Sequence, residues 1–117
     1  MEMELSKKEK KIARDLISKG QQEDLKRGLL EFDAILQKWK DEAGHNGDCF
    51  YTLYESIRDY RKWIALRYDR VSGSHYVDTL IYQLFNNLYP ASEIDEFRPE
   101  IKDYILLRVK RAREDRS

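Results

Sequence analysis

Apolar residues of this chain recur at intervals of three and four positions, which is the spacing of an amphipathic helix. The clearest stripe lies within 21–43, and its members are Leu25, Gly28, Leu29, Phe32, Ile35, Leu36, Trp39 and Ala43. A second stripe lies within 49–70, and its members are Phe50, Leu53, Tyr54, Ile57, Tyr60, Ile64 and Tyr68. No segment alternates apolar and polar residues for long enough to predict a strand. The pattern therefore predicts an all-α fold.

Start and stop signals divide this pattern into five helices. Ser6 and Glu9 have the spacing of a capping box, and Gly20 is expected to end the helix that they begin. Pro99 suits the first turn of the last helix. The expected helices are 6–20, 21–43, 49–70, 75–89 and 98–113, with a helical turn or loop in 91–97. Short connections favour an up-and-down antiparallel bundle of four main helices plus a shorter N-terminal helix.

The stripes also predict which side chains face the core. Gly28 lies inside an apolar stripe, where glycine costs about 1 kcal/mol relative to alanine, so we expect another helix to approach closely there. Most aromatic residues of 49–70 are expected to face the core, whereas Trp63 and Leu66 project away from it. Arg61 lies within the apolar stripe and must extend to solvent or meet a carboxylate.

Length and composition indicate a single helical domain, 1–117, with a frayed tail at 113–117. The chain carries 22 Lys and Arg and 22 Asp and Glu, so no global field attracts it to nucleic acid or to an anionic membrane. Residues 71–97 are acidic and residues 98–117 are basic. Cys49 is the only cysteine, and neither a signal peptide nor a membrane-spanning run is evident, so we expect a cytoplasmic protein without a membrane partner.

Catalytic chemistry has little support in the sequence. No nucleophile elbow, P-loop, zinc-protease or dinucleotide motif is present, so we assign no catalytic residue and no cofactor. His45, Asp48 and Cys49 are of types that bind zinc, but only His75 remains as a further histidine and no second cysteine exists. We therefore predict no metal site and interpret these residues as a polar loop with a helix cap.

The segment 67–76 holds the densest group of polar functional side chains. These side chains could together bind an anion. The alternative is structural: they are the charged end of one helix, a glycine turn and the caps of the next helix. The residues concerned are Arg67, Arg70, Ser72, Ser74 and His75. On this third interpretation the chain is a small anion- or nucleotide-binding domain or enzyme.

Two basic groups suggest a nucleic-acid-associated regulator instead. They are Arg58, Arg61, Lys62, Arg67 and Arg70 on the third expected helix, and Lys102, Arg108, Lys110, Arg111 and Arg113 on the fifth. Acidic residues are interspersed with both groups, which favours pairing within each helix over binding of phosphate. Nucleic acid is therefore the second interpretation.

Apolar residues outside the narrow stripes favour a different function. They exceed what one core needs, and exposed apolar surface is typical of protein interfaces. They are Leu30, Trp63, Leu66, Leu106 and Leu107. The sequence thus predicts a non-enzymatic protein-binding or self-assembly module, whose partner is another protein or a second copy in a homodimer.

Overall fold

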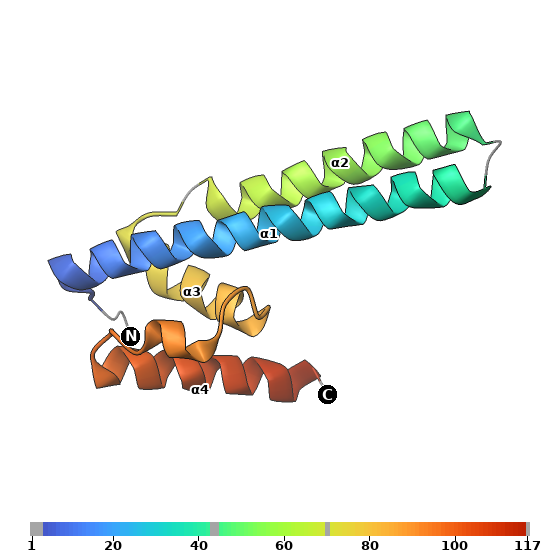
Figure 1. Ribbon diagram of the computed structural model, residues 1–117. Helices are drawn as coiled ribbons and strands as arrows, with labels where there is room; N and C mark the ends of the chain where they lie inside the picture. Colours follow the sequence, from blue (N-terminus) through green and yellow to red (C-terminus); the bar gives the residue numbers. More distant parts are fainter. Residues whose placement is uncertain (1–3, 43–44, 70, 117) are drawn as a thin grey trace. The chain divides into compact units, whose positions relative to one another are not determined.

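The computed structural model describes residues 4–42, 45–69 and 71–116 (Figure 1). These residues contain four α-helices and no strand, which confirms the all-α prediction. The helices are α1 (Lys7–Glu42), α2 (Asn46–Tyr68), α3 (Tyr76–Phe85) and α4 (Pro99–Arg116), with short 3-10 turns at Gly73–His75 and Ala91–Ile94.

Gly20 does not end a helix, and the prediction of a separate N-terminal helix is wrong. Residues 6–20 and 21–43 were expected as two helices, but α1 runs continuously through Gly20. A Cβ atom at this position would lie 2.3 Å from Nε2 of Gln83. The fully buried Gln83 amide donates to the Ile17 carbonyl (2.9 Å) and accepts from the Tyr89 hydroxyl (3.0 Å). Gly20 thus provides room for a buried amide.

The chain divides into two compact units. The first part of α1 belongs to one unit and the second part belongs to the other. The core unit is 1–23 with 71–117, and the hairpin unit is 24–70. The single domain 1–117 and the up-and-down bundle of the whole chain stay predictions. Fraying of 113–117 also stays a prediction, and α4 continues to Arg116.

The core unit contains a conventional apolar interior. On α4, Ile101, Ile105 and Val109 follow each other at intervals of four and are buried, so one side of this helix faces inward. Residues from the segment 5–17, α3 and the segment 88–97 complete the interior. The remaining buried apolar residues are Leu5, Ala13, Leu16, Ile17, Leu80, Leu84, Leu88, Tyr89, Ile94 and Phe97.

The predicted capping box at the start of α1 is confirmed. The Ser6 N–H donates to Oε1 of Glu9 (3.0 Å), and the Glu9 N–H donates to Oγ of Ser6 (3.1 Å). The Arg98 backbone N–H and its guanidinium also donate to the Glu9 carboxylate, each at 3.1 Å. Burial raises the pKa of Glu9, but these hydrogen bonds outweigh burial and hold the pKa below its ordinary value.

α3 ends earlier than the sequence predicted, at Phe85 rather than Tyr89. Asn87 adopts the left-handed conformation (φ 56°), which asparagine tolerates better than most residues. The Leu88 N–H then donates to the Gln83 carbonyl (3.0 Å), closing the helix end. The expected helical turn in 91–97 is present at Ala91–Ile94.

The hairpin unit is an antiparallel pair formed by 24–42 of α1 and by α2 (Figure 1). The predicted close approach at Gly28 is confirmed, because a Cβ atom there would lie 2.6 Å from Cε1 of Tyr60. The Tyr60 hydroxyl donates to the Asp24 carbonyl, and its ring meets Phe32 edge-on at 5.8 Å. Burial, and then the Asp24 carboxylate, raises the pKa of Tyr60.

Asp24 anchors the open end of the hairpin. It is only 4% exposed, and it accepts hydrogen bonds from the Tyr68 hydroxyl (2.8 Å) and the Arg67 guanidinium (3.5 Å). At the other end, Nε1 of Trp39 donates to Oδ1 of Asn46 (2.8 Å). Polar contacts therefore hold the pair in register at both ends.

The prediction that the aromatic residues of 49–70 face a core is wrong. No residue of α2 is buried, and Phe50 and Tyr54 are 66% and 58% exposed. The physical reason is that a pair of helices covers only the line along which the two helices touch. Asp48, expected as a cap, lies within the first turn of α2, whose N-cap is His45.

Candidate functional site

Exposed apolar side chains are concentrated on the hairpin unit. Among the described residues, the core unit exposes two large apolar side chains, Leu106 and Leu107. The hairpin unit exposes ten, namely Leu25, Leu29, Leu30, Trp39, Phe50, Tyr51, Tyr54, Ile57, Trp63 and Leu66.

The positions of these residues follow from the contact line of the hairpin. On α1 the contacts with α2 involve Asp24, Gly28, Trp39 and also Ile35, whose carbonyl faces the Cys49 thiol. On α2 they involve Asn46, Cys49, Tyr60 and Arg67. Spacings of three, four, seven and eleven keep these residues on one line along each helix, because each is close to a whole number of turns.

One side of that line is apolar on both helices. On α1, Leu25, Leu29 and Leu36 each follow a contact residue by one position. On α2, Phe50 follows Cys49 by one position. Ile57 precedes Tyr60 by three positions, and at 3.6 residues per turn this displacement is a rotation around the helix in the same direction. Because the two helices are antiparallel, the same rotation away from the contact line on α1 and on α2 leads to the same side of the pair.

We call this surface the apolar face. Five of its members are exposed: Leu25 36%, Leu29 66%, Phe50 66%, Tyr54 58% and Ile57 45%. Two more, Phe32 and Leu36, are half-buried between them. The apolar face is thus continuous across α1 and α2.

The opposite side of the hairpin is mainly polar, and it carries Trp63 and Leu66. The predicted interface residues Trp63, Leu66 and Leu30 are 56%, 82% and 58% exposed, but none belongs to the apolar face. The Arg67 guanidinium lies 5.2 Å from the centre of the Trp63 ring. Their role as an interface stays a prediction.

The sequence interpretation missed the apolar face because its residues were assigned to a core. A signal was present, since Leu25, Leu29 and Leu36 stand directly beside Gly28 and Ile35. This makes the stripe wider than contact with one neighbouring helix requires.

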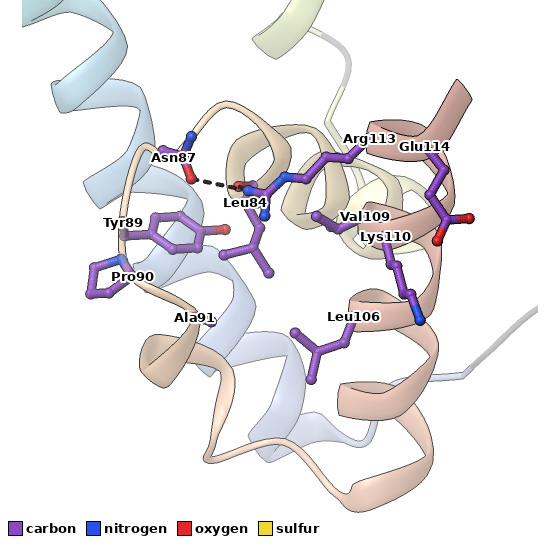
Figure 2. A pocket seen from close by; sticks show the side chains of 10 residues that line it. All are labelled: Leu84, Asn87, Tyr89, Pro90, Ala91, Leu106, Val109, Lys110, Arg113 and Glu114. Atoms are coloured by element: carbon purple, nitrogen blue, oxygen red, sulfur yellow. Dashed lines mark hydrogen bonds between the residues drawn. The ribbon is translucent and has the colours of Figure 1, made fainter. Parts of the chain in front are cut away.

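Leu106, another predicted interface residue, lines a cavity of the core unit. The cavity has a volume of about 420 Å³ and lies between the end of α3, the segment 87–91 and α4 (Figure 2). Leu84, Leu106 and Val109 extend into it, with Arg113 across its upper edge and Lys110 on the α4 side. The Arg113 guanidinium donates to the Asn87 side chain (3.0 Å) and the Leu84 carbonyl (3.3 Å), so it caps α3.

The proposed anion-binding residues have separate surroundings. Ser72, Ser74 and His75 come together on the core unit, where both hydroxyls lie 3.1–3.2 Å from Nδ1 of His75. All three are exposed, and Ser72 makes no side-chain cap. Arg67 belongs to the hairpin unit and contacts Asp24 and Trp63. Arg70 lies outside the described residues.

His45, Asp48 and Cys49 line a cavity of about 400 Å³ at the tip of the hairpin, beside Ile35 and Trp39. Nδ1 of His45 lies 3.9 Å from Oδ2 of Asp48, and both side chains are strongly exposed. The Cys49 thiol is half-buried and faces the Ile35 carbonyl at 4.0 Å. Within the described residues, no three acidic, histidine or cysteine side chains gather as a metal would require.

Several members of the two basic groups have partners within their own unit. On α4, Lys102 pairs with Asp95 (2.8 Å), which raises the pKa of Lys102, and Arg108 covers the Tyr104 ring. On α2, Arg58 lies 3.5 Å from Asp59. These contacts lessen the basic surface available to phosphate.

No protein-family model, curated protein or solved structure matches this sequence. Within the described part of the chain, the helices lack the combination of length and apolar character that crossing a membrane requires. Functional inference therefore depends on the residues and their geometry.

Proposed function

We propose that this chain is a non-enzymatic, cytosolic protein-binding module that uses the apolar face of its hairpin unit. The main observation in support of this function is that α2 has no buried residue, although its apolar stripe is continuous with that of α1. Since α1 and α2 touch along one line, the apolar side chains beside that line are available to a partner. We thus assign the protein-binding surface to this face and not to the residues that the sequence suggested, which are Leu30, Trp63, Leu66, Leu106 and Leu107.

The size of the apolar face supports this function. With on the order of 200 Å² for a large side chain, its five exposed members offer roughly 500 Å². A contiguous apolar patch of about 300–600 Å² on a monomer is often functional. Covering such a patch contributes about 25 cal/mol per Å² before the costs of association, so a partner helix gains a substantial driving force.

The nucleic-acid interpretation is less favoured, because pairing occupies several of its cations. It remains a separate hypothesis with a direct test. A gel shift at low salt with duplex and single-stranded oligonucleotides that shows no complex would remove it.

Oxidative footprinting tests the proposed function. The full chain is exposed to hydroxyl radicals at several dilutions, while sedimentation gives its mass under the same conditions. We expect Phe50 and Tyr54 in the monomer to react about as fast as the exposed Tyr51. Slow oxidation of Phe50 and Tyr54 in a monomer would mean that the chain covers its own apolar face, and the proposal would fail.

A further inference from the structure

Charges around the apolar face indicate the chemistry of its partner. On a helix, the neighbours of a residue lie three and four positions away. Five charged residues lie at these distances from the seven members of the apolar face. Four are positive and one is negative: Lys26, Lys40, Arg58 and Arg61 against Asp33. We call these five residues the rim.

The rim is unlike the hairpin as a whole. Residues 24–70 carry nine Lys and Arg and nine Asp and Glu, so the excess of positive charge is local to the apolar face. All five rim residues are exposed. The side chains of Lys26, Lys40 and Arg61 make no hydrogen bond or ion pair with any residue that the structure describes. These cations are therefore available to carboxylates of a partner.

We propose that the apolar face binds an amphipathic α-helix whose apolar stripe is flanked by Asp and Glu. This inference rests on the proposed function and names the partner's chemistry. An apolar helix laid between α1 and α2 contacts Leu29 on one side and Phe50 on the other, over the half-buried Phe32. Its acidic flanks then meet the cations of the rim. The result is a three-helix bundle.

The length of the partner follows from the geometry of α1. Leu25 and Leu36 are 11 residues apart, which corresponds to about 16 Å at 1.5 Å per residue. A helix of about 12–16 residues spans this distance. Such a helix is marginal alone in water, so it gains its structure upon binding.

The rim disfavours a second copy of the chain as the partner. A two-fold interface places the same surface on both sides, so the four cations of one copy would face those of the other with only Asp33 to offset them. An anionic membrane is also less suitable. A flat surface contacts the protruding Leu29 and Phe50, whereas a helix also reaches the half-buried Phe32, which lies nearer the line along which α1 and α2 touch.

The probes are two labelled 16-residue peptides with the same leucine stripe, one flanked by glutamates and the other by lysines. Fluorescence anisotropy measures their binding to the full chain. We expect the glutamate peptide to bind on the order of tenfold more tightly at low salt, with the difference shrinking as salt screens the rim. Equal binding, or preference for the lysine peptide, would overturn the inference.

Matched variants locate the binding surface. Leu29→Asp changes the apolar face and should abolish binding, whereas Leu66→Asp on the other side should leave it unchanged. Lys40→Glu with Arg61→Glu should reverse the preference between the peptides. Lys38→Glu with Lys62→Glu makes the same change of charge away from the face and should preserve it. Circular dichroism checks that each variant is folded. We expect all of them to fold, because the substituted side chains are exposed.

The remaining outcomes separate this inference from the proposed function. If Leu29→Asp changes the mass of a self-associated chain and neither peptide binds, the partner is a second copy and the inference is wrong, while the proposed function stands. Binding only to anionic lipid vesicles contradicts both proposals. Slow oxidation of Phe50 and Tyr54 in a monomer likewise contradicts both.

Discussion

The two units use apolar residues in opposite ways. Every large apolar residue that is buried in the described part of the chain belongs to the core unit, whereas ten of the twelve exposed ones belong to the hairpin unit. Both units are helical and both have residues spaced for a helical face. The comparison teaches that an apolar stripe shows which side of a helix needs a cover without showing where the cover comes from.

The two units resemble each other in their polar interiors. The core unit buries Glu9 and Gln83, the hairpin unit buries Asp24, and all three have hydrogen-bonding partners. No buried side-chain nitrogen or oxygen of the described residues lacks a hydrogen bond. The hairpin is therefore specific in its register, although it encloses little apolar volume. This combination suits a preformed binding surface.

The largest expected difference between the units concerns isoleucine. Ile105 is fully buried on α4, so Ile105→Ala should destabilise the protein by about 2–5 kcal/mol. Ile57 is 45% exposed on the apolar face, and Ile57→Ala should change stability by at most about 0.5 kcal/mol. Urea denaturation followed by circular dichroism measures both. Similar losses for the two variants would show that Ile57 is covered in solution.

A smaller effect is expected where α1 and α2 touch. Gly28→Ala places a methyl group against the Tyr60 ring, at a cost of about 1–3 kcal/mol that outweighs the roughly 1 kcal/mol gained in helix propensity. Gly47→Ala is the control, because no other part of the chain that the structure describes comes within 4 Å of the added methyl group. Hydrogen exchange of the amides of α2 should quicken in Gly28→Ala and slow in Gly47→Ala. The opposite order would contradict the described contact.

The smallest expected effect depends on pH and belongs to the core unit alone. Because the folded pKa of Glu9 is lowered, its contribution to stability is present above the ordinary carboxyl pKa and is lost as pH falls through the folded value. Glu9→Gln should therefore cost about 1–2 kcal/mol at pH 7 and progressively less in acid. Urea titrations at pH 7 and pH 3 measure this. A constant difference between the two pH values would argue against the carboxylate as the cause.

Local features of the fold were predictable, because local chemistry determines them. Ser6 and Glu9 cap α1 through neighbouring backbone groups, and Gly28 signalled a close contact that Tyr60 provides. Gly20 was misleading, since glycine is compatible both with a helix end and with a close approach inside a helix. Only Gln83, far along the chain, decides between them. That contact is tertiary, so local spacing does not contain it.

The candidate site was partly predictable for a similar reason. The sequence indicated apolar surface in excess of one core, but the residues to which we assigned that surface were Leu30, Trp63, Leu66, Leu106 and Leu107. Phe50, Tyr54 and Ile57 were assigned to an interior because they share a stripe with Tyr60. Only the three-dimensional pairing shows that α1 covers Tyr60 and leaves their side open. The excess of positive charge in the rim could be recognised only after the apolar face was known, because the rim is defined by its neighbours on that face.

Residue-resolved hydrogen exchange of the full chain tests the contrast between the units most directly, because α1 belongs to both. We expect slow exchange for amides of 12–20 and of Ile101–Val109, which lie in the core unit. Exchange should become distinctly faster along α1 beyond Leu25 and throughout α2, where opening of the hairpin exposes little apolar surface. Uniformly slow exchange along the whole of α1 and α2 in the monomer would contradict an uncovered apolar face.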